Sequence, residues 1–443
     1  MSTIVATLES LLSPEQVVGR DQIAPFLARG LQQTTSDGSL PEAVVYPQTE
    51  AELGQVMACA DQNHWRVLPI GGGSKLGWGG LGQTCDVAIC TQRLSSIVDH
   101  AVGDMTLTAG AGLRLSDLKP RLAQHRQFLA VDPAYPDLAT LGGIVSTAST
   151  GSLRQRYASV RDMLIGISFV RSDGQLAKAG GRVVKNVAGY DLMKLMTGAY
   201  GSLGIISQVT FRLYPIPDSS QTVVAMGSPD LLGRFTAALR QSSLTPVCLD
   251  VLSPTLAADL GLQQTFALAA RFQANGPGVA EQVDRFHRMA SAELSLQVLE
   301  EAAESELWSR QDDRLFPSWD PKAHWDETVV VTKFGVPPDT VLDLLAQVHS
   351  EVSSCGRARI HVGSGIGTLT LWAEAASLDS LQKFRQWCEA REGYCTLLQA
   401  PKAMKQSMDV WGYNGKALPL MGRIKTTFDP NQLLSPGRFV GGL

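Results

Sequence analysis

The residues with the clearest chemical potential form a run of glycines directly after an expected strand. Residues 69–80 read Pro-Ile-Gly-Gly-Gly-Ser-Lys-Leu-Gly-Trp-Gly-Gly. Adjacent glycines allow backbone conformations that a side chain disfavours, so consecutive N–H groups can point at one anion. Ser74 can add a hydroxyl donor and Lys75 a positive charge. The run therefore predicts a pyrophosphate site, with a glycine-rich surface turn as the competing interpretation.

Two familiar phosphate motifs are excluded in this region. Residues 77–82 match GxGxxG, but that fingerprint requires a strand before the glycines and a helix opening from them. Here a strand expected at residues 86–90 comes next. A GxxxxGK run followed by Ser or Thr is absent from the sequence. A Rossmann nicotinamide site and a P-loop are therefore both disfavoured.

Two further segments are rich in glycine and hydroxyl side chains. Within residues 132–152, positions 139–152 read Ala-Thr-Leu-Gly-Gly-Ile-Val-Ser-Thr-Ala-Ser-Thr-Gly-Ser. We expect this stretch to be too polar for a core helix, which leaves its backbone and hydroxyls available to a ligand. The other segment, residues 180–210, contains the run Lys-Asn-Val-Ala-Gly-Tyr-Asp at 185–191.

In this fixed order, the three segments resemble the FAD-binding domain of the vanillyl-alcohol oxidase and p-cresol methylhydroxylase family. Within that family they are similar to the FAD-binding subunit of glycolate oxidase (glycolate dehydrogenase), to which residues 185–191 are most specific. The likeness covers residues 40–216. It returns at residues 428–438, Phe-Asp-Pro-Asn-Gln-Leu-Leu-Ser-Pro-Gly-Arg, which resemble the family's closing element.

The resemblance implies which residues hold FAD, with the charged candidates at Lys75, Lys185 and Arg438. It assigns the pyrophosphate to Gly71, Gly72, Gly73 and Ser74, the flavin and ribityl side to Thr140, Gly142, Gly143, Thr147 and Ser149, and the adenine to the backbone of Ile206. For Gly198, Gly201 and Gly204, glycine-rich packing is an equally good explanation. By hypothesis, Arg182 or Lys185 stabilises negative charge at N1 and C2=O of reduced flavin; solvated strand-end charges are the alternative.

The residue after the three glycines bears on how FAD is attached. Relatives that bond FAD covalently have a His at this position, since attachment to the flavin methyl group needs an imidazole nucleophile. This chain has Ser74 there. The departure predicts noncovalent FAD, unless a His from the second domain is used, for which His361 is the candidate.

A metal site typical of catalytic relatives is disrupted. Relatives that oxidise 2-hydroxy acids carry His-x-Gly-Asp-Gly-Asn-x-His, whose imidazoles and carboxylate can bind a divalent metal. Here residues 361–368 read His-Val-Gly-Ser-Gly-Ile-Gly-Thr, so Ser364, Ile366 and Thr368 replace three of these groups. No metal site is expected. His361 is either a substrate-side base or, as we favour, a histidine hydrogen-bonded at a strand end.

The resemblance implies a function within a complex. The chain would be the FAD subunit of an enzyme that oxidises glycolate or D-lactate, with a catalytic flavoprotein subunit and an iron–sulfur subunit as partners. Arg357, Arg359 and Arg438 are candidates for binding a substrate carboxylate, although surface arginines are commonly solvated. Alternatives are a self-sufficient FAD enzyme acting on a hydroxy acid or an alcohol, and a scaffold that has lost its flavin. The intact glycine segments weigh against the scaffold.

The elements that must position these residues indicate an α+β protein of two parts. Residues 1–36 are expected to be a helical extension, 37–216 a two-lobed PCMH-type FAD-binding domain, and 217–443 a cap domain with an antiparallel sheet and the closing element 428–438. Strands are expected at 43–46, 66–70, 86–90, 105–109, 266–272, 328–334, 358–362 and 368–374, and helices at 49–63, 113–124, 229–241, 278–289, 339–352 and 378–392.

Composition limits the partners and the location. A net charge of -4, from 38 Lys and Arg against 42 Asp and Glu, without a basic stripe, argues against nucleic acid. The start lacks the basic residues of a secretory signal and no stretch suits a membrane span, so we expect a cytoplasmic chain that meets a membrane only through partners. The seven cysteines contain no CxxC pair, which disfavours an iron–sulfur cluster in this chain.

Overall fold

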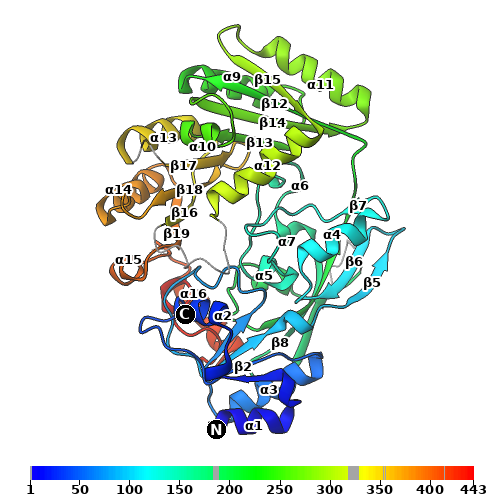
Figure 1. Cartoon of the computed structure of the whole chain (residues 1–443), viewed down its shortest axis with the longest axis vertical. Coiled ribbons are helices and arrows are strands. Elements are labelled where there is room, and N and C mark those ends of the chain that lie inside the picture. The colour runs from blue at the N-terminus through cyan, green and yellow to red at the C-terminus, as the bar shows by residue number, and fades with distance from the viewer. Residues whose placement is uncertain (1, 183–188, 318–328, 353, 355, 414) are drawn as a thin grey trace. The chain divides into compact units, whose positions relative to one another are not determined.

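The computed structural model describes residues 2–182, 189–317, 329–352, 354, 356–413 and 415–443. The chain forms two compact units (Figure 1). The first unit comprises Met1–Thr150, Ser159–Ile216 and Tyr413–Leu443, and the second comprises Gly151–Ala158 and Pro217–Gly412. The expected α+β fold with an antiparallel sheet in the second part is confirmed.

The first unit contains a small sheet that leads into the glycine run. Its order is β1-β2-β4-β3, with parallel pairing of β2 with β4 and of β4 with β3. The helix between β2 and β3 begins at its cap Thr49, whose side chain accepts a hydrogen bond from Glu52 N, and it buries Leu53 and Met57 against the sheet. The elements are α1 (Thr3–Leu11), β1 (Val17–Gly19), α2 (Pro25–Gln32), β2 (Ala43–Val45), α3 (Glu50–Gln62), β3 (Val67–Ile70) and β4 (Val87–Cys90).

A second sheet in this unit is antiparallel, in the order β5-β6-β10-β8-β9. Its strands β6, β8 and β10 alternate buried apolar residues with small or hydroxyl residues, as a sheet covered on both faces requires. The elements are β5 (Ile97–Ala101), β6 (Thr106–Gly110), α4 (Leu115–Ala123), β7 (Gln127–Phe128), α5 (Leu141–Ser146), α7 (Val160–Met163), β8 (Leu164–Val170), β9 (Leu176–Gly180), α8 (Leu192–Met196), β10 (Ile205–Arg212), β11 (Tyr214–Pro215) and α16 (Leu418–Phe428).

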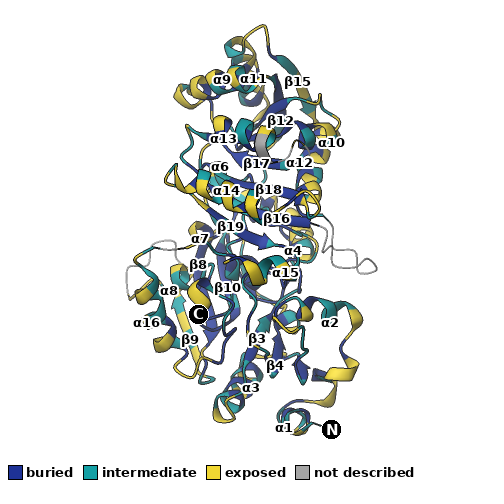
Figure 2. Ribbon diagram, turned by 90° about the vertical axis from the view of Figure 1, so that its left-hand side faces the viewer, coloured by how far each residue is buried: buried dark blue, intermediate teal, exposed yellow. Residues whose placement is uncertain are grey.

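The second unit is built on one eight-stranded antiparallel sheet in the order β15-β12-β14-β13-β17-β18-β16-β19. Figure 2 shows its strands largely buried, while the outer surfaces of α9 and α14 are exposed. The elements are α6 (Arg154–Tyr157), β12 (Ser219–Gly227), α9 (Pro229–Gln241), β13 (Cys248–Leu252), α10 (Pro254–Asp259), β14 (Phe266–Ala274), α11 (Gly276–Met289), β15 (Ser295–Glu300), α12 (Glu301–Leu315), β16 (Val329–Gly335), α13 (Val341–Gln347), β17 (Arg357–His361), β18 (Ile366–Trp372), α14 (Leu378–Glu389), β19 (Tyr394–Gln399) and α15 (Lys402–Ser407).

The two faces of this sheet differ in chemistry. One face carries apolar residues such as Leu249, Ile360 and Leu369, which pack under α9, α11, α13 and α14. Because side chains alternate along a strand, the residues between them lie on the other face. The register places Asp250 opposite His361, and Arg359 and Lys333 on either side of Thr368. The second face is therefore polar.

The ends of the chain differ from the expected domain borders. Residues 413–443, expected in the cap domain, group with the first unit, because Val67 N donates to Leu433 O and Ser435 N donates to Val67 O beside β3. Residues 1–36 are not a separate extension, since Val5, Leu8 and other residues of α1 and β1 belong to the core under α3. Both differences arise from contacts distant in sequence.

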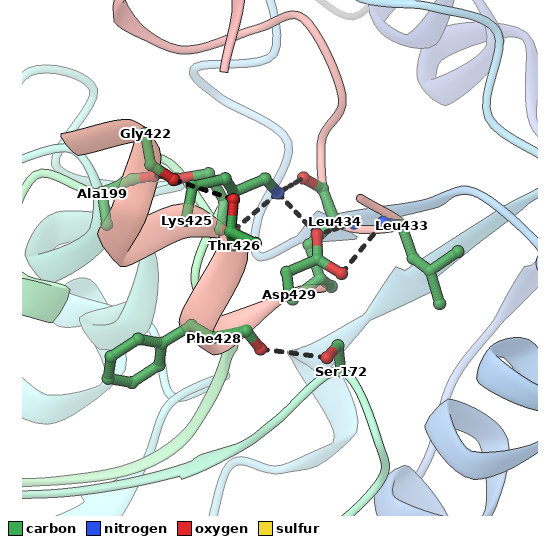
Figure 3. Close-up of polar contacts among 10 residues, drawn as sticks. Ser172, Ala199, Gly422, Lys425, Thr426, Phe428, Asp429, Leu433 and Leu434 are labelled. Carbon is green, nitrogen blue, oxygen red and sulfur yellow. Dashed lines mark hydrogen bonds and ion pairs between the residues drawn. The ribbon is translucent and has the colours of Figure 1, made fainter. Parts of the chain in front are cut away.

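A buried ion pair fixes the returning C-terminal segment (Figure 3). Lys425 Nζ donates to Asp429 Oδ2 at 2.5 Å, to Ser202 O at 2.9 Å and to Leu434 O at 2.8 Å. Asp429 in turn accepts hydrogen bonds from the backbone N–H groups of Leu433 and Leu434. The pair thus uses all the hydrogen bonds that a buried ammonium can donate, and it holds the segment beside β3.

One local expectation was wrong. The sequence predicts that residues 132–152 are too polar for a core helix. In the structure, Leu141–Ser146 form α5, with Leu141, Ile144 and Val145 buried. The hydroxyls act at its ends: Thr140 Oγ1 accepts from Gly143 N at 3.3 Å, and Thr147 Oγ1 donates to Gly143 O at 2.7 Å. These local hydrogen bonds satisfy backbone groups at the two ends of the short buried helix.

Candidate functional site

The glycine run forms one wall of a groove in the first unit. The volume of the groove is about 110 Å³. Its lining contains most of the residues that the sequence assigned to FAD: Gly71, Gly72, Gly73, Ser74, Lys75, Thr140, Gly142, Gly143, Thr147, Ile206 and Arg438. The structure therefore gathers three distant segments around one space.

The groove wall presents a row of backbone donors. Among the described residues, the N–H groups of Gly72, Gly73, Ser74 and Lys75 have no hydrogen-bond acceptor. Gly73 has φ +75°, a left-handed conformation that suits glycine and turns the chain here. Consecutive N–H groups without an acceptor are what a diphosphate requires, so this wall fits the pyrophosphate of FAD.

Lys75 adds a cation of unusual character to this wall. Its Nζ lies 5.6 Å from the ring centroid of Trp78 and 5.9 Å from that of Tyr135. Burial lowers the pKa of Lys75 to about 7. An ammonium held over aromatic faces lacks the charge compensation of a carboxylate, so an anion in the groove would stabilise its protonated form.

The glycines are also required by packing within the protein. A Cβ on Gly71 would lie 2.2 Å from Thr140 Oγ1, and one on Gly72 would lie 2.0 Å from Leu138 O. A Cβ on Gly142 would lie 2.7 Å from the Cβ of Ala111. These three glycines let the groove walls approach each other, a requirement separate from any ligand.

Arg438 connects the closing element to the loop after the glycine run. Its Nη2 donates to Leu76 O at 2.9 Å and to Trp78 O at 2.6 Å, and a Cβ on Gly82 would lie 2.6 Å from its Cγ. Burial lowers the pKa of Arg438 to about 10, which leaves it charged at neutral pH. Arg438 therefore supports the shape of the groove that it lines.

Other assigned residues lie elsewhere. Ser149 does not line the groove; its Oγ accepts a hydrogen bond from Ala134 N at 3.2 Å. Lys185 lies outside the described residues. Arg182 is largely exposed and pairs with Asp99 at 3.3 Å, away from the groove lining, which favours the interpretation as a solvated strand-end charge.

The groove also contains residues that the sequence did not single out. Tyr200 and Pro69 line it, as do Gly201 and Gly204, for which packing was the alternative. A Cβ on Gly201 would lie 3.1 Å from the Pro69 ring, so packing does contribute there. Tyr135, which lies beside Lys75, is 60 positions further along the chain, and no sequence pattern predicts that contact.

In the second unit, the polar sheet face is centred on Asp250. Its carboxylate accepts a hydrogen bond from Ser152 Oγ at 2.5 Å and bonds His361 Nδ1 at 2.7 Å, and all three residues are buried. Burial opposes ionisation of Asp250, but His361, Arg359 and Ser152 hold its pKa below the ordinary value. Burial lowers the pKa of His361. A neutral imidazole that donates from Nδ1 keeps Nε2 as an acceptor.

The candidate carboxylate-binding arginines already have partners. Arg357 Nε bonds Asp259 at 2.5 Å, and its guanidinium lies 5.3 Å from the Trp372 ring centroid. Arg359 Nη1 bonds Asp312 at 2.8 Å. Arg438 also donates to carbonyl oxygens, so each of the three arginines has protein partners in this structure.

Lys333 is a cation on the same sheet face that the sequence reading missed. Burial, with a smaller contribution from Arg154, lowers its pKa to about 8. Within the described part of the chain, the side-chain ammonium of Lys333 has neither a carboxylate partner nor a hydrogen bond. A lysine in the middle of an otherwise apolar strand, Val-Val-Val-Thr-Lys-Phe-Gly, was the signal that could have found it.

No three His, Cys, Asp or Glu side chains in the described ranges lie as a metal ion would require. Ser364 lies in the turn after His361, and Ile366 and Thr368 lie in β18. Among the helices of the described ranges, none is long and apolar enough to cross a membrane.

The fold and the groove now define the class of protein. Residues 41–180 match the family model of the FAD binding domain. The chain is an FAD-dependent oxidoreductase with an FAD binding domain, and its fold is similar to that of p-cresol methylhydroxylase. The family resemblance stated from the sequence and the choice of FAD as cofactor are both confirmed.

Particular relatives refine this class. The chain is similar to glycolate oxidase subunit GlcD of Bacillus subtilis, with 22% identity over 439 residues that cover 94% of this chain and 93% of the relative. Glycolate oxidase subunit GlcE of Escherichia coli is 37% identical over 140 residues, 31% of this chain and 39% of the relative. The structure of p-cresol methylhydroxylase covers 98% of this chain and 96% of its own length, with 14% identity and a TM-score of 0.70, and that likeness shows the fold.

Proposed function

We propose that this chain is the FAD-binding subunit of a glycolate oxidase (glycolate dehydrogenase) type complex that oxidises glycolate or D-lactate. The observation that carries the proposal is the groove wall of Gly72–Lys75. Among the residues that the structure describes, its four N–H groups have no acceptor and the Lys75 ammonium has no carboxylate partner. Likeness over nearly the full length of a glycolate oxidase subunit supports the substrate class. Partners in the proposal are a catalytic flavoprotein subunit and an iron–sulfur subunit.

The residues of the groove have defined tasks in this proposal. The Gly72–Lys75 wall binds the pyrophosphate, with Ser74 and Lys75 adding a hydroxyl donor and a charge. Ser74 cannot form the imidazole link to the flavin methyl group, so FAD is bound without a covalent bond. When bound, FAD would supply the redox chemistry through which electrons pass within the complex.

A self-sufficient hydroxy-acid oxidoreductase is the second candidate. The Asp250–His361 pair and Lys333 favour it, because a neutral imidazole can accept the hydroxyl proton and an ammonium can bind the carboxylate. His361 would then be a base, and the pairing with Asp250 would fix its tautomer. In the leading proposal, the same contacts serve only the stability of the sheet face.

Mixing the purified chain with glycolate or D-lactate in a stopped-flow instrument separates the two candidates. The leading proposal expects no rapid loss of flavin absorbance in the isolated chain, turnover once the partner subunits are added, and little effect of His361→Ala. Rapid bleaching that His361→Ala suppresses would overturn it in favour of the self-sufficient enzyme. Acid precipitation should release all flavin into the supernatant; flavin that stays with the protein would contradict the noncovalent assignment.

A further inference from the structure

A cavity in the second unit lies apart from the polar sheet face. It is bounded by α9, the loop after it, and strands β13 and β14. Its volume is about 220 Å³. Protein interiors contain few voids larger than a water molecule, and an apolar cavity of about 150 Å³ already binds benzene. A space of this size is large enough for a small aromatic molecule.

The body of the cavity is apolar and aromatic. Its walls are Leu239, Leu244, Pro246, Leu249, Ala270, Phe272 and Phe286. Phe286 meets Phe235 and Phe272 edge to face, with ring centroids 4.8 Å and 6.0 Å apart. A further ring can join this cluster in the same geometry, which makes an aromatic occupant more favourable than a flexible chain.

The polar groups at the cavity carry donors and positive charge, and none of the described residues that line it is acidic. Arg240 is exposed, and the described part of the chain gives its guanidinium no ion pair. Gln155 presents a side-chain amide against Gly363, where a Cβ would lie 2.2 Å from Gln155 Oε1. A guanidinium beside an amide suits a carboxylate, which can accept from both.

We propose that this cavity binds a small aromatic carboxylic acid, with its ring among the phenylalanines and its carboxylate at Arg240 and Gln155. The site is separate from the FAD groove, because none of its lining residues belongs to the first unit. The proposal does not depend on the oxidation reaction.

Calorimetric titration of the FAD-loaded chain with benzoate tests the proposal, with benzylamine and benzene as parallel probes. Benzoate should bind more tightly than benzene, and benzylamine should not bind. Arg240→Gln should weaken benzoate by about tenfold and leave benzene unchanged. Arg234→Gln is the matched control, since Arg234 is on the same helix and pairs with Asp230 instead.

A second variant fills the space itself. Ala270→Leu places three more carbon atoms in the cavity, so it should abolish the binding of both benzoate and benzene, while FAD content stays at the wild-type level. Absence of benzoate binding to the wild-type chain would overturn the proposal. Equal binding of benzoate and benzylamine, or unchanged binding in folded Ala270→Leu, would also overturn it.

Discussion

The groove of the first unit and the Asp250 cluster on the sheet face of the second differ in how their polar groups are paired. In the cluster, Asp250 bonds Ser152 and His361, and Arg359 bonds Asp312. In the groove wall, the N–H groups of Gly72–Lys75 have no acceptor among the described residues. Unpaired buried polar groups cost stability unless a partner arrives. The contrast indicates that the paired groups of the Asp250 cluster stabilise the fold, whereas the N–H groups of the groove wall are available to bind a ligand.

The largest effect should come from a fully paired cluster in the same unit as the groove. Lys425→Met removes the ammonium and leaves Asp429 buried without its ion partner, so the free energy of unfolding should fall by about 3–5 kcal/mol. Urea denaturation of the FAD-free protein measures the change. Lys383→Met removes an exposed helical ion pair and should cost no more than about 1 kcal/mol. Equal losses of unfolding free energy in Lys425→Met and Lys383→Met would contradict the special importance of the buried pair.

Asp250→Ala should show the same dependence on pairing in the second unit. The substitution leaves Ser152 Oγ and His361 Nδ1 buried without their hydrogen-bond partner. We therefore expect the free energy of unfolding to fall by about 3 kcal/mol, with near-normal FAD content. The pKa of Asp250 is lowered in the fold, so its contribution is present above the unfolded value of about 3.9 and is lost as pH falls below it. The difference between variant and wild type should therefore shrink in acid. Asp250→Asn, which keeps an acceptor, should recover part of the loss.

Lys75→Met should instead weaken FAD binding while leaving the stability of the protein nearly unchanged. The affinity for FAD should fall about tenfold or more, because the pyrophosphate loses a charged donor. The FAD-free protein should change by no more than about 0.5 kcal/mol, since burial already disfavours the ammonium there. Fluorescence titration of apoprotein measures the affinity. Lys119→Met, at an exposed position, is the control; a loss of affinity there would remove the special role of Lys75.

The smallest effect is a pH dependence of FAD affinity. With a pKa of about 7 in the free groove, Lys75 takes up a proton when the diphosphate binds above that pH. Proton uptake on binding makes affinity fall as pH rises, so it should decline between about pH 7 and 8.5 by at most about tenfold per unit. Lys75→Met should give a flat profile over this range. A rise of affinity with pH in the wild type would contradict the assignment.

The sequence predicted local elements well and spatial partners poorly. The helix expected at residues 49–63 is present as α3, and its buried residues Leu53, Val56, Met57 and Ala60 follow the 3.6-residue period of a single buried face. Several strands were missed, among them β13 and β19, because runs of five and six residues are too short to show a clear period.

The candidate site shows the same limit. The glycine and hydroxyl segments were recognisable, since backbone conformation and donors are local properties. Lys75 against Tyr135 and the Asp250–His361 pair were not, since each joins segments far apart in the chain. The placement of the closing segment beside β3 was missed for the same reason.

The Lys425–Asp429 pair has a consequence for the order in which the protein is made. Residues 413–443 complete the first unit, yet the ribosome synthesises them after the whole of Pro217–Gly412. Domains that fold during synthesis do so as their residues emerge. The second unit can thus form while the first still lacks the strand-side segment and Arg438 that shape its groove. The FAD groove can therefore be completed only after residues 413–443 have been synthesised.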